Sequence, residues 1–100
     1  MIVQSDFDIK ELNISETLTV ANYPFSLVVW NDEINTFEWV IESLMSVCQH
    51  TEEQAEQCAM LIHFKGKYAV KNGEYETLKP MCDAITERNI NATIEEVVNR

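Results

Sequence analysis

The sequence predicts an α+β fold, in which a small three-stranded antiparallel sheet packs with three helices in the order β-α-α-β-α-β. Short β-rich runs bounded by turn residues alternate with longer stretches whose apolar residues recur at helical spacing. The chain has 100 residues, 46% of them apolar and 24% charged, which suits one globular domain. Mixed elements of this kind place the helices against one face of the sheet.

The first strand is predicted at residues 25–30 (FSLVVW), where β-branched and aromatic residues fill a run bounded by turn residues. Its nearly continuous apolar character predicts a position inside the sheet. A helix follows, for which Asn35 is the expected N-cap and Glu38 would complete a capping box. Helical spacing defines the buried face of this helix, which is Phe37, Val40, Ile41, Leu44, Val47 and Cys48.

The second helix is predicted to begin at Thr51, because residues 51–54 (TEEQ) have the pattern of a capping box with two acids in the first turn. Gly66 is expected to end this helix. His63 follows Ala59 by four residues, so it is placed at the edge of the core stripe. The stripe itself is predicted to be Ala55, Cys58, Ala59 and Ile62.

The C-terminal part is predicted to hold two strands and one helix. Residues 67–71 alternate polar and apolar, which indicates a half-exposed strand, and Asn72-Gly73 is a turn signal. A helix is expected over about 77–88, with Pro80 in the first turn, where amide groups lack helical partners. A short last strand is expected at residues 92–97. The inward face of the helix is predicted to be Leu78, Met81, Cys82 and Ile85.

The charge and its distribution restrict the class of partner. The net charge is −10, and residues 23–64 contain no Lys or Arg. This segment creates a field that favours cations and repels phosphate backbones, so nucleic acid is not an expected partner. Part of the pattern also reflects the preference for acids near helix N-termini. The acids of the segment are Asp32, Glu33, Glu38, Glu42, Glu52, Glu53 and Glu56.

Residues 1–22 are acidic with scattered apolar side chains, and we expect a flexible N-terminal extension before a core domain at residues 23–100. No secretory signal is visible, and no apolar run approaches the ~20 residues that span a bilayer. The cysteines lack CxxC spacing, so we expect buried or half-buried thiols in a reducing compartment and no zinc site. We therefore expect a cytoplasmic protein without metal, cofactor or membrane contact. The cysteines are Cys48, Cys58 and Cys82.

A polar corner follows the first strand. Asn31 offers an amide oxygen, Asp32 and Glu33 offer carboxylates, and Phe37 offers an apolar rim. This combination suits a ligand with a positive head and an apolar body. Asn and Asp are also common in turns and helix caps. From the corner alone, Asn31, Asp32 and Asn35 could therefore have a purely structural role.

Two kinds of chemistry are also open at this corner. Asp32 and His63 could orient one another as a catalytic base pair, although no Ser or Cys nucleophile is placed beside them by the sequence. A metal held by Asp32, Glu33 and His63 would rest on isolated residues rather than on a ligand pattern. His63 by itself also fits a structural histidine at the edge of a helix face.

Two linked motifs carry a resemblance to a known family. Residues 27–40 (LVVWNDEINTFEWV) resemble the signature of the ClpS adaptor family, a hydrophobic strand, then Asn-Asp-Asp, an aromatic residue and Thr-Pro-Met-Glu-Phe-Val. Residues 63–67 (HFKGK) match the second family motif, His-Tyr-x-Gly-Lys. The spacing between the motifs fits without a gap, so the pair is far more specific than either motif. The resemblance is strong from Tyr23 to Lys67 and looser to Val97.

The resemblance implies an adaptor of the bacterial N-degron pathway, which binds proteins whose first residue is Leu, Phe, Tyr or Trp. Such an adaptor delivers them to a Clp-type AAA+ unfoldase, ClpA- or ClpC-like, coupled to the ClpP protease. By resemblance, Asn31, Asp32 and His63 would bind the α-amino group of the substrate. Glu33 would add negative field, and Asn35 would lie near the substrate backbone. The implied hydrophobic pocket is Phe37, Val40, Ala59 and Ile62.

The resemblance further implies a monomeric protein without catalytic activity that docks on the N-terminal domain of the unfoldase, with residues 1–22 engaged during delivery. One alternative is a module of the same fold that docks on a Clp ATPase without reading N-termini, and a small hydrolase is another. Phe37 and Ala59 stand where the family commonly has Met, which predicts a reshaped pocket and an altered ranking of first residues. The family sequence is not recognisable at residues 72–80, so no docking residue is carried over.

Overall fold

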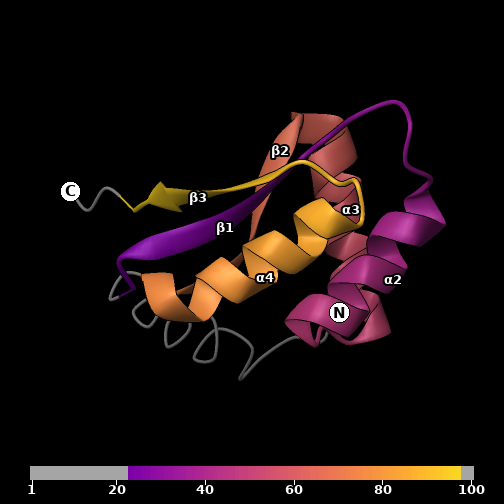
Figure 1. The fold of residues 1–100 in the computed structure, drawn as a ribbon. Helices are drawn as coiled ribbons and strands as arrows, with labels where there is room; N and C mark the ends of the chain where they lie inside the picture. Colours follow the sequence, from indigo (N-terminus) through magenta and orange to yellow (C-terminus); the bar gives the residue numbers. More distant parts are fainter. Residues whose placement is uncertain (1–22, 98–100) are drawn as a thin grey trace, which may run out of the picture.

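The computed structural model describes residues 23–97, so the predicted extension at 1–22 and the last three residues of the predicted core lie outside the described residues. Within this range the elements follow the predicted order, and the α+β fold class is confirmed. No helix in the described part is long and apolar enough to cross a membrane. The elements, labelled as in Figure 1, are β1 (Phe25–Trp30), α2 (Phe37–Cys48), α3 (Glu52–Lys65), β2 (Lys67–Gly73), α4 (Tyr75–Glu87) and β3 (Ala92–Glu96).

β1 is the central strand of a three-stranded sheet with the order β2-β1-β3, and it is antiparallel to both neighbours. Trp30 pairs with Lys67 at one end of the strand, and Phe25 pairs with Glu96 at the other end. The four residues between the strand ends are buried, which confirms that this apolar run lies inside the sheet. The chain therefore leaves β1 at the middle of one end of the sheet.

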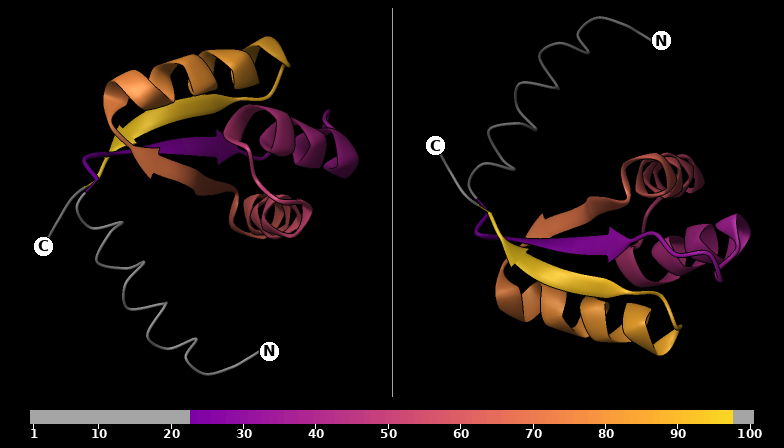
Figure 2. Two further views of the ribbon diagram at one scale, coloured as in Figure 1. Left: turned by 90° about the horizontal axis from the view of Figure 1, so that it is seen from below. Right: turned by 90° about the horizontal axis from the view of Figure 1, so that it is seen from above.

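The hydrophobic core lies between the sheet and α4 and continues into the α2–α3 pair. Leu27 and Val29 of β1 are buried in one cluster with Leu78 and Ile85 of α4. The other two residues predicted on the inward face of α4 are partly buried against the same cluster, so that prediction is confirmed. Figure 2 shows α4 along one face of the sheet, with α2 and α3 gathered at the end where β1 stops.

Threonine residues cap both α2 and α3. Thr51 forms the predicted capping box, and Gly66 ends α3 as predicted, with a φ of 91° that suits glycine. The N-cap of α2 is Thr36, whose hydroxyl accepts a hydrogen bond of 3.0 Å from the amide three residues later. The predicted N-cap at Asn35, with a capping box to Glu38, is therefore wrong. The Asn35 side chain instead donates two hydrogen bonds elsewhere.

Two boundaries in the C-terminal part differ from the prediction. β2 continues to Gly73, and Asn72 pairs with Ser26, whose hydroxyl donates to the Asn72 side chain. Pairing with β1 therefore overrides the local turn signal. α4 begins at Tyr75, two residues before the expected start, so Pro80 lies in the second turn and not in the first. A proline there lacks an amide donor, which leaves the carbonyl four residues earlier without a helical partner.

The three cysteines are free thiols, as predicted, and they pack among apolar residues. Cys48 is buried, and Cys58 and Cys82 are half-buried. Burial raises the pKa of the Cys48 thiol to about 11, so this group is uncharged at neutral pH. Cys48 therefore behaves as a small apolar residue of the core.

We predict that Thr36→Ala lowers the free energy of unfolding by about 1 kcal/mol, because a first-turn amide of α2 loses its side-chain acceptor. Thr36→Ser keeps the hydroxyl and should retain most of the stability. Urea denaturation followed by circular dichroism measures both variants. An Ala variant as stable as the wild type would show that this cap does not stabilise α2.

Candidate functional site

The corner after β1 is anchored by two backbone hydrogen bonds where it leaves the sheet. The amide of Trp30 donates to the carbonyl of Asn91, and the amide of Asn31 donates to the carbonyl of Gly66, each at 2.9 Å. Gly66 is the C-cap of α3, the helix that bears His63 in its last turn. The second bond therefore joins the corner directly to the end of α3.

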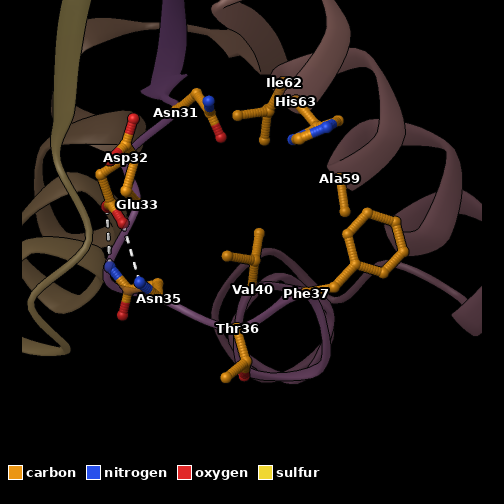
Figure 3. Close-up of a pocket in the computed structure, with 10 residues that line it drawn as sticks. All are labelled: Asn31, Asp32, Glu33, Asn35, Thr36, Phe37, Val40, Ala59, Ile62 and His63. Atoms are coloured by element: carbon orange, nitrogen blue, oxygen red, sulfur yellow. Dashed lines mark hydrogen bonds between the residues drawn. The ribbon is translucent and has the colours of Figure 1, made fainter.

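A hollow of about 430 Å³ opens between this corner, the start of α2 and the C-terminal half of α3. Figure 3 shows the side chains arranged around it. All nine residues predicted from the sequence as site residues line this hollow. A tenth, Thr36, was not predicted, although its position as a threonine at a helix start was an available signal. The lining residues are Asn31, Asp32, Glu33, Asn35, Thr36, Phe37, Val40, Ala59, Ile62 and His63.

Four side chains form the apolar part of the hollow. Ala59 and Ile62 are each 3% exposed, and Val40 is half-buried. Phe37 was predicted on the buried face of α2, but it is 43% exposed, so that part of the prediction is wrong. Phe37 is the first residue of the helix, and its ring lies beside Ala59 at the rim of the hollow (Figure 3).

Asn31 and His63 line the hollow from different elements. In Figure 3 the amide oxygen of Asn31 and the ring of His63 both lie at the edge of the hollow near Ile62. Within residues 23–97, neither side chain takes part in an intramolecular hydrogen bond. The His63 ring packs edge-on against Phe64, with ring centroids 5.1 Å apart. Both residues therefore keep acceptor atoms available to a ligand.

The Asp32 carboxylate is held by three hydrogen bonds from the residues that follow it. Its Oδ1 accepts from the amides of Ile34 and Asn35, and its Oδ2 accepts from Asn35 Nδ2, each at 2.8 Å. These bonds, chiefly the one from the Asn35 amide, hold the pKa of Asp32 below its ordinary value. The group is therefore ionised at neutral pH. A carboxylate has about four lone-pair sites, so one remains for a ligand.

The arrangement does not form the base pair that the sequence left open. Both carboxylate oxygens of Asp32 bond to Asn35, and within residues 23–97 no hydrogen bond joins Asp32 to His63. Nor does the described part of the chain contain a group of three or more His, Cys, Asp or Glu side chains that could hold a metal ion. The hollow is suited to binding a cation above an apolar surface.

Asn35 connects the corner to the end of α4. Its Nδ2 donates to Asp32 Oδ2 and to the carbonyl of Asn89, both at 2.8 Å. Both N–H groups of the amide are therefore used, and the amide oxygen remains as an acceptor. A second link lies beside it, because Trp39 Nε1 donates to the carbonyl of Arg88 at 3.0 Å.

The fold and the hollow together define a small α+β domain with an apolar hollow, bordered by carboxylates, at a strand-to-helix corner. A family model described as "ATP-dependent Clp protease adaptor protein ClpS" matches residues 21–94. The chain belongs to the ClpS family of Clp protease adaptors.

Curated relatives named ATP-dependent Clp protease adapter protein ClpS agree with this assignment. The protein of Corynebacterium jeikeium is 29% identical over 66 residues, which cover 66% of this chain and 65% of that protein, just under two thirds of its length. The protein of Corynebacterium aurimucosum is 25% identical over 81% of this chain and 73% of its own length. The protein of Corynebacterium glutamicum strain R is 26% identical over 86% of this chain and 85% of its own length.

A solved structure has the same fold. It is Agrobacterium tumefaciens ClpS2 bound to L-phenylalaninamide, with a TM-score of 0.65 and 21% sequence identity. The match covers 75% of this chain and 98% of that chain. It agrees with the predicted arrangement of a three-stranded antiparallel sheet and three helices.

We predict that Asn35→Asp destabilises the protein more than Asn35→Ala at pH 7, because it removes the same donors and places a second carboxylate beside Asp32. Asn35→Ala should lower the free energy of unfolding by about 1–2 kcal/mol through its lost hydrogen bonds. The gap between the two variants should narrow toward pH 4, where one carboxyl of the Asp pair takes up a proton. Urea denaturation at both pH values measures the gap, and a gap that is independent of pH would contradict the role of Asn35 beside Asp32.

Proposed function

We propose that this protein is an adaptor that binds proteins through a free N-terminal residue with a bulky hydrophobic side chain and delivers them to a Clp-type AAA+ unfoldase. One observation carries the proposal: the apolar hollow opens beside a hydrogen-bonded carboxylate and two acceptor side chains that have no hydrogen-bond partner within residues 23–97. In an N-terminal Leu, Phe, Tyr or Trp, the α-ammonium group and the apolar side chain are attached to the same α-carbon. The polar side of the hollow suits the ammonium group, and the apolar side suits the side chain.

The α-amino group accounts for the polar side of the hollow. A free α-amino group is mostly protonated at neutral pH, since its pKa is roughly 8. Asn31 supplies an amide oxygen, His63 supplies a ring nitrogen, and Asp32 supplies its remaining lone pair and its charge. Three acceptors then match the three N–H donors of the ammonium group. Glu33 is exposed at the same corner, and within the described residues its carboxylate forms no salt bridge or hydrogen bond. Its negative charge would therefore add to the attraction of the ammonium group. An internal peptide lacks this cation.

The apolar side of the hollow accounts for selection of the first side chain. Phe37, Val40, Ala59 and Ile62 would surround it, and its burial contributes roughly 1.5–3 kcal/mol. Phenylalaninamide, the compound bound to the Agrobacterium tumefaciens relative, carries both a free α-amino group and a phenyl side chain. That likeness of ligand to hollow supports the proposal. Asn35, with its amide oxygen free, would accept a hydrogen bond from the backbone of the bound chain.

The family supports the proposed delivery to a Clp protease. The family model and the curated relatives are described as adaptors of the Clp protease. We propose that the partner is the N-terminal domain of a ClpA- or ClpC-like unfoldase and that the protein acts as a monomer in the bacterial cytoplasm. Its own part in degradation is then recognition and transfer of the substrate, without a chemical step.

We predict that a Phe-initiated peptide binds and that its N-acetylated twin does not, because acetylation removes the cation and leaves the side chain intact. Fluorescence anisotropy with a dye at the C-terminal end of each peptide measures both affinities. The acetylated peptide should bind at least tenfold more weakly, because the loss of even one hydrogen bond to a charged group costs about 1.5 kcal/mol or more. Equal binding of the two peptides would instead favour a module that docks on a Clp ATPase without reading N-termini.

We predict that His63→Leu lowers the affinity for the Phe-initiated peptide by about tenfold, because it removes the ring nitrogen that would accept a hydrogen bond from the ammonium group. His63→Gln supplies a side-chain oxygen as an acceptor and should retain more of the affinity. Fluorescence anisotropy measures both variants. Wild-type affinity in the Leu variant would contradict this role of His63.

We predict that Ala59→Met shifts the ranking of first residues away from Trp and toward Leu, because the longer side chain fills part of the hollow. If the Trp side chain loses the burial of about one methylene group, its binding free energy falls by roughly 0.8 kcal/mol. This corresponds to about a fourfold change in the Trp-to-Leu affinity ratio. Peptides that differ only in the first residue measure this ratio. Met60→Ala changes the next residue of α3, which lies outside the hollow and is 48% exposed, and should leave the ratio unchanged.

A further inference from the structure

A second hollow lies along the seam between α2 and α3, and we refer to it as the seam groove. Its volume is about 460 Å³. It shares Phe37 with the first hollow, so the two hollows adjoin at this residue. The first hollow lies at the start of α2 and the C-terminal half of α3, and the seam groove continues toward the opposite end of the helix pair. Its lining residues are Phe37, Glu38, Ile41, Glu42, Met45, Ser46, Glu52 and Glu56.

The seam groove combines an apolar surface with an acidic rim. Phe37 and Met45 are 43% and 39% exposed, which is high for large apolar side chains, and Ile41 is half-buried between them in sequence. Four glutamates surround this surface, two from each helix. Within residues 23–97, the salt bridges are Lys67–Glu95 and Lys79–Asp83, so none of the groove glutamates is paired.

Helix stability does not explain all four charges. Glu38 and Glu52 lie in the first turns of α2 and α3, where the helix dipole favours acids. Glu42 and Glu56 lie one turn further along, each four residues after another glutamate, where like charges destabilise a helix. Helix stability therefore does not account for these two carboxylates.

We propose that the seam groove receives the second and third residues of the bound chain and favours a Lys or Arg side chain there. The inference rests on the proposed function, since it takes the first residue to occupy the first hollow. A chain leaving that hollow past Phe37 enters the seam groove directly. Lys and Arg each carry an apolar stem and a charged head. The stem would lie on Ile41 and Met45, with the head between Glu42 and Glu56.

Three Phe-initiated peptides with Arg, Ala or Glu at positions two and three test this proposal. The Arg peptide should bind the wild-type protein about five- to tenfold more tightly than the Ala peptide, as expected of one or two exposed ion pairs, and the Glu peptide more weakly. The advantage should shrink at high salt, because these charges are solvent-exposed.

A matched pair of double variants separates the groove from the net charge. Glu42→Gln with Glu56→Gln should bring the Arg-to-Ala affinity ratio close to one. Glu76→Gln with Glu96→Gln removes the same charge at the far end of the molecule, where Phe25 pairs with Glu96 and packs against Tyr75, and should leave the ratio unchanged. Equal loss in both double variants, or no Arg preference in the wild type, would overturn the proposal.

Comparison of free and N-acetylated peptides distinguishes a failure of the proposed function from a failure of the groove proposal. If the Ala peptide binds and its N-acetylated twin does not, the first residue is read, and the Arg-to-Ala ratio then decides the role of the groove alone. If acetylated and free Arg peptides bind equally, the groove attracts cationic peptides without a first-residue anchor. That result would overturn the proposed path from the first hollow.

Discussion

The polar corner after β1 depends on one carboxylate that is held by its own neighbours. Asp32 takes three hydrogen bonds from the two residues at positions 34 and 35, and Asn35 passes the restraint on to the carbonyl of Asn89. The side-chain amide of Asn35 thus links the Asp32 carboxylate to the turn after α4. A charge fixed in this way needs no rearrangement to meet a cation, and pre-organisation of this kind lowers the entropic cost of binding.

Much of the fold could be predicted because local signals and tertiary packing agree at β1 and α3. The run at residues 25–30 is apolar throughout, and such a run fits a central strand that is covered on both edges. Thr51 and Gly66 mark the ends of α3 with residue types that suit those positions in isolation. The two motifs that line the hollow lie in or beside these same elements, so their spacing along the chain translates into proximity in space.

The errors arise where a distant contact decides between local options. Asn35 has the chemistry of an N-cap, but its amide bonds to a carbonyl 54 residues later, and the next residue caps the helix. Asn72-Gly73 has the residue types of a turn, but both residues lie in β2 because they pair with β1. The seam groove was not predicted, because glutamates on two helices meet only once those helices pack together.

The backbone hydrogen bond between Asn31 and Gly66 has a consequence for how an occupant would leave the hollow. It joins the corner to the C-cap of α3, so these two walls of the hollow are tied to each other. Under the proposed function, the occupant would then be held by its own few contacts, and those contacts would set its residence time. A second protein that grips the same chain further along would withdraw it against those contacts alone.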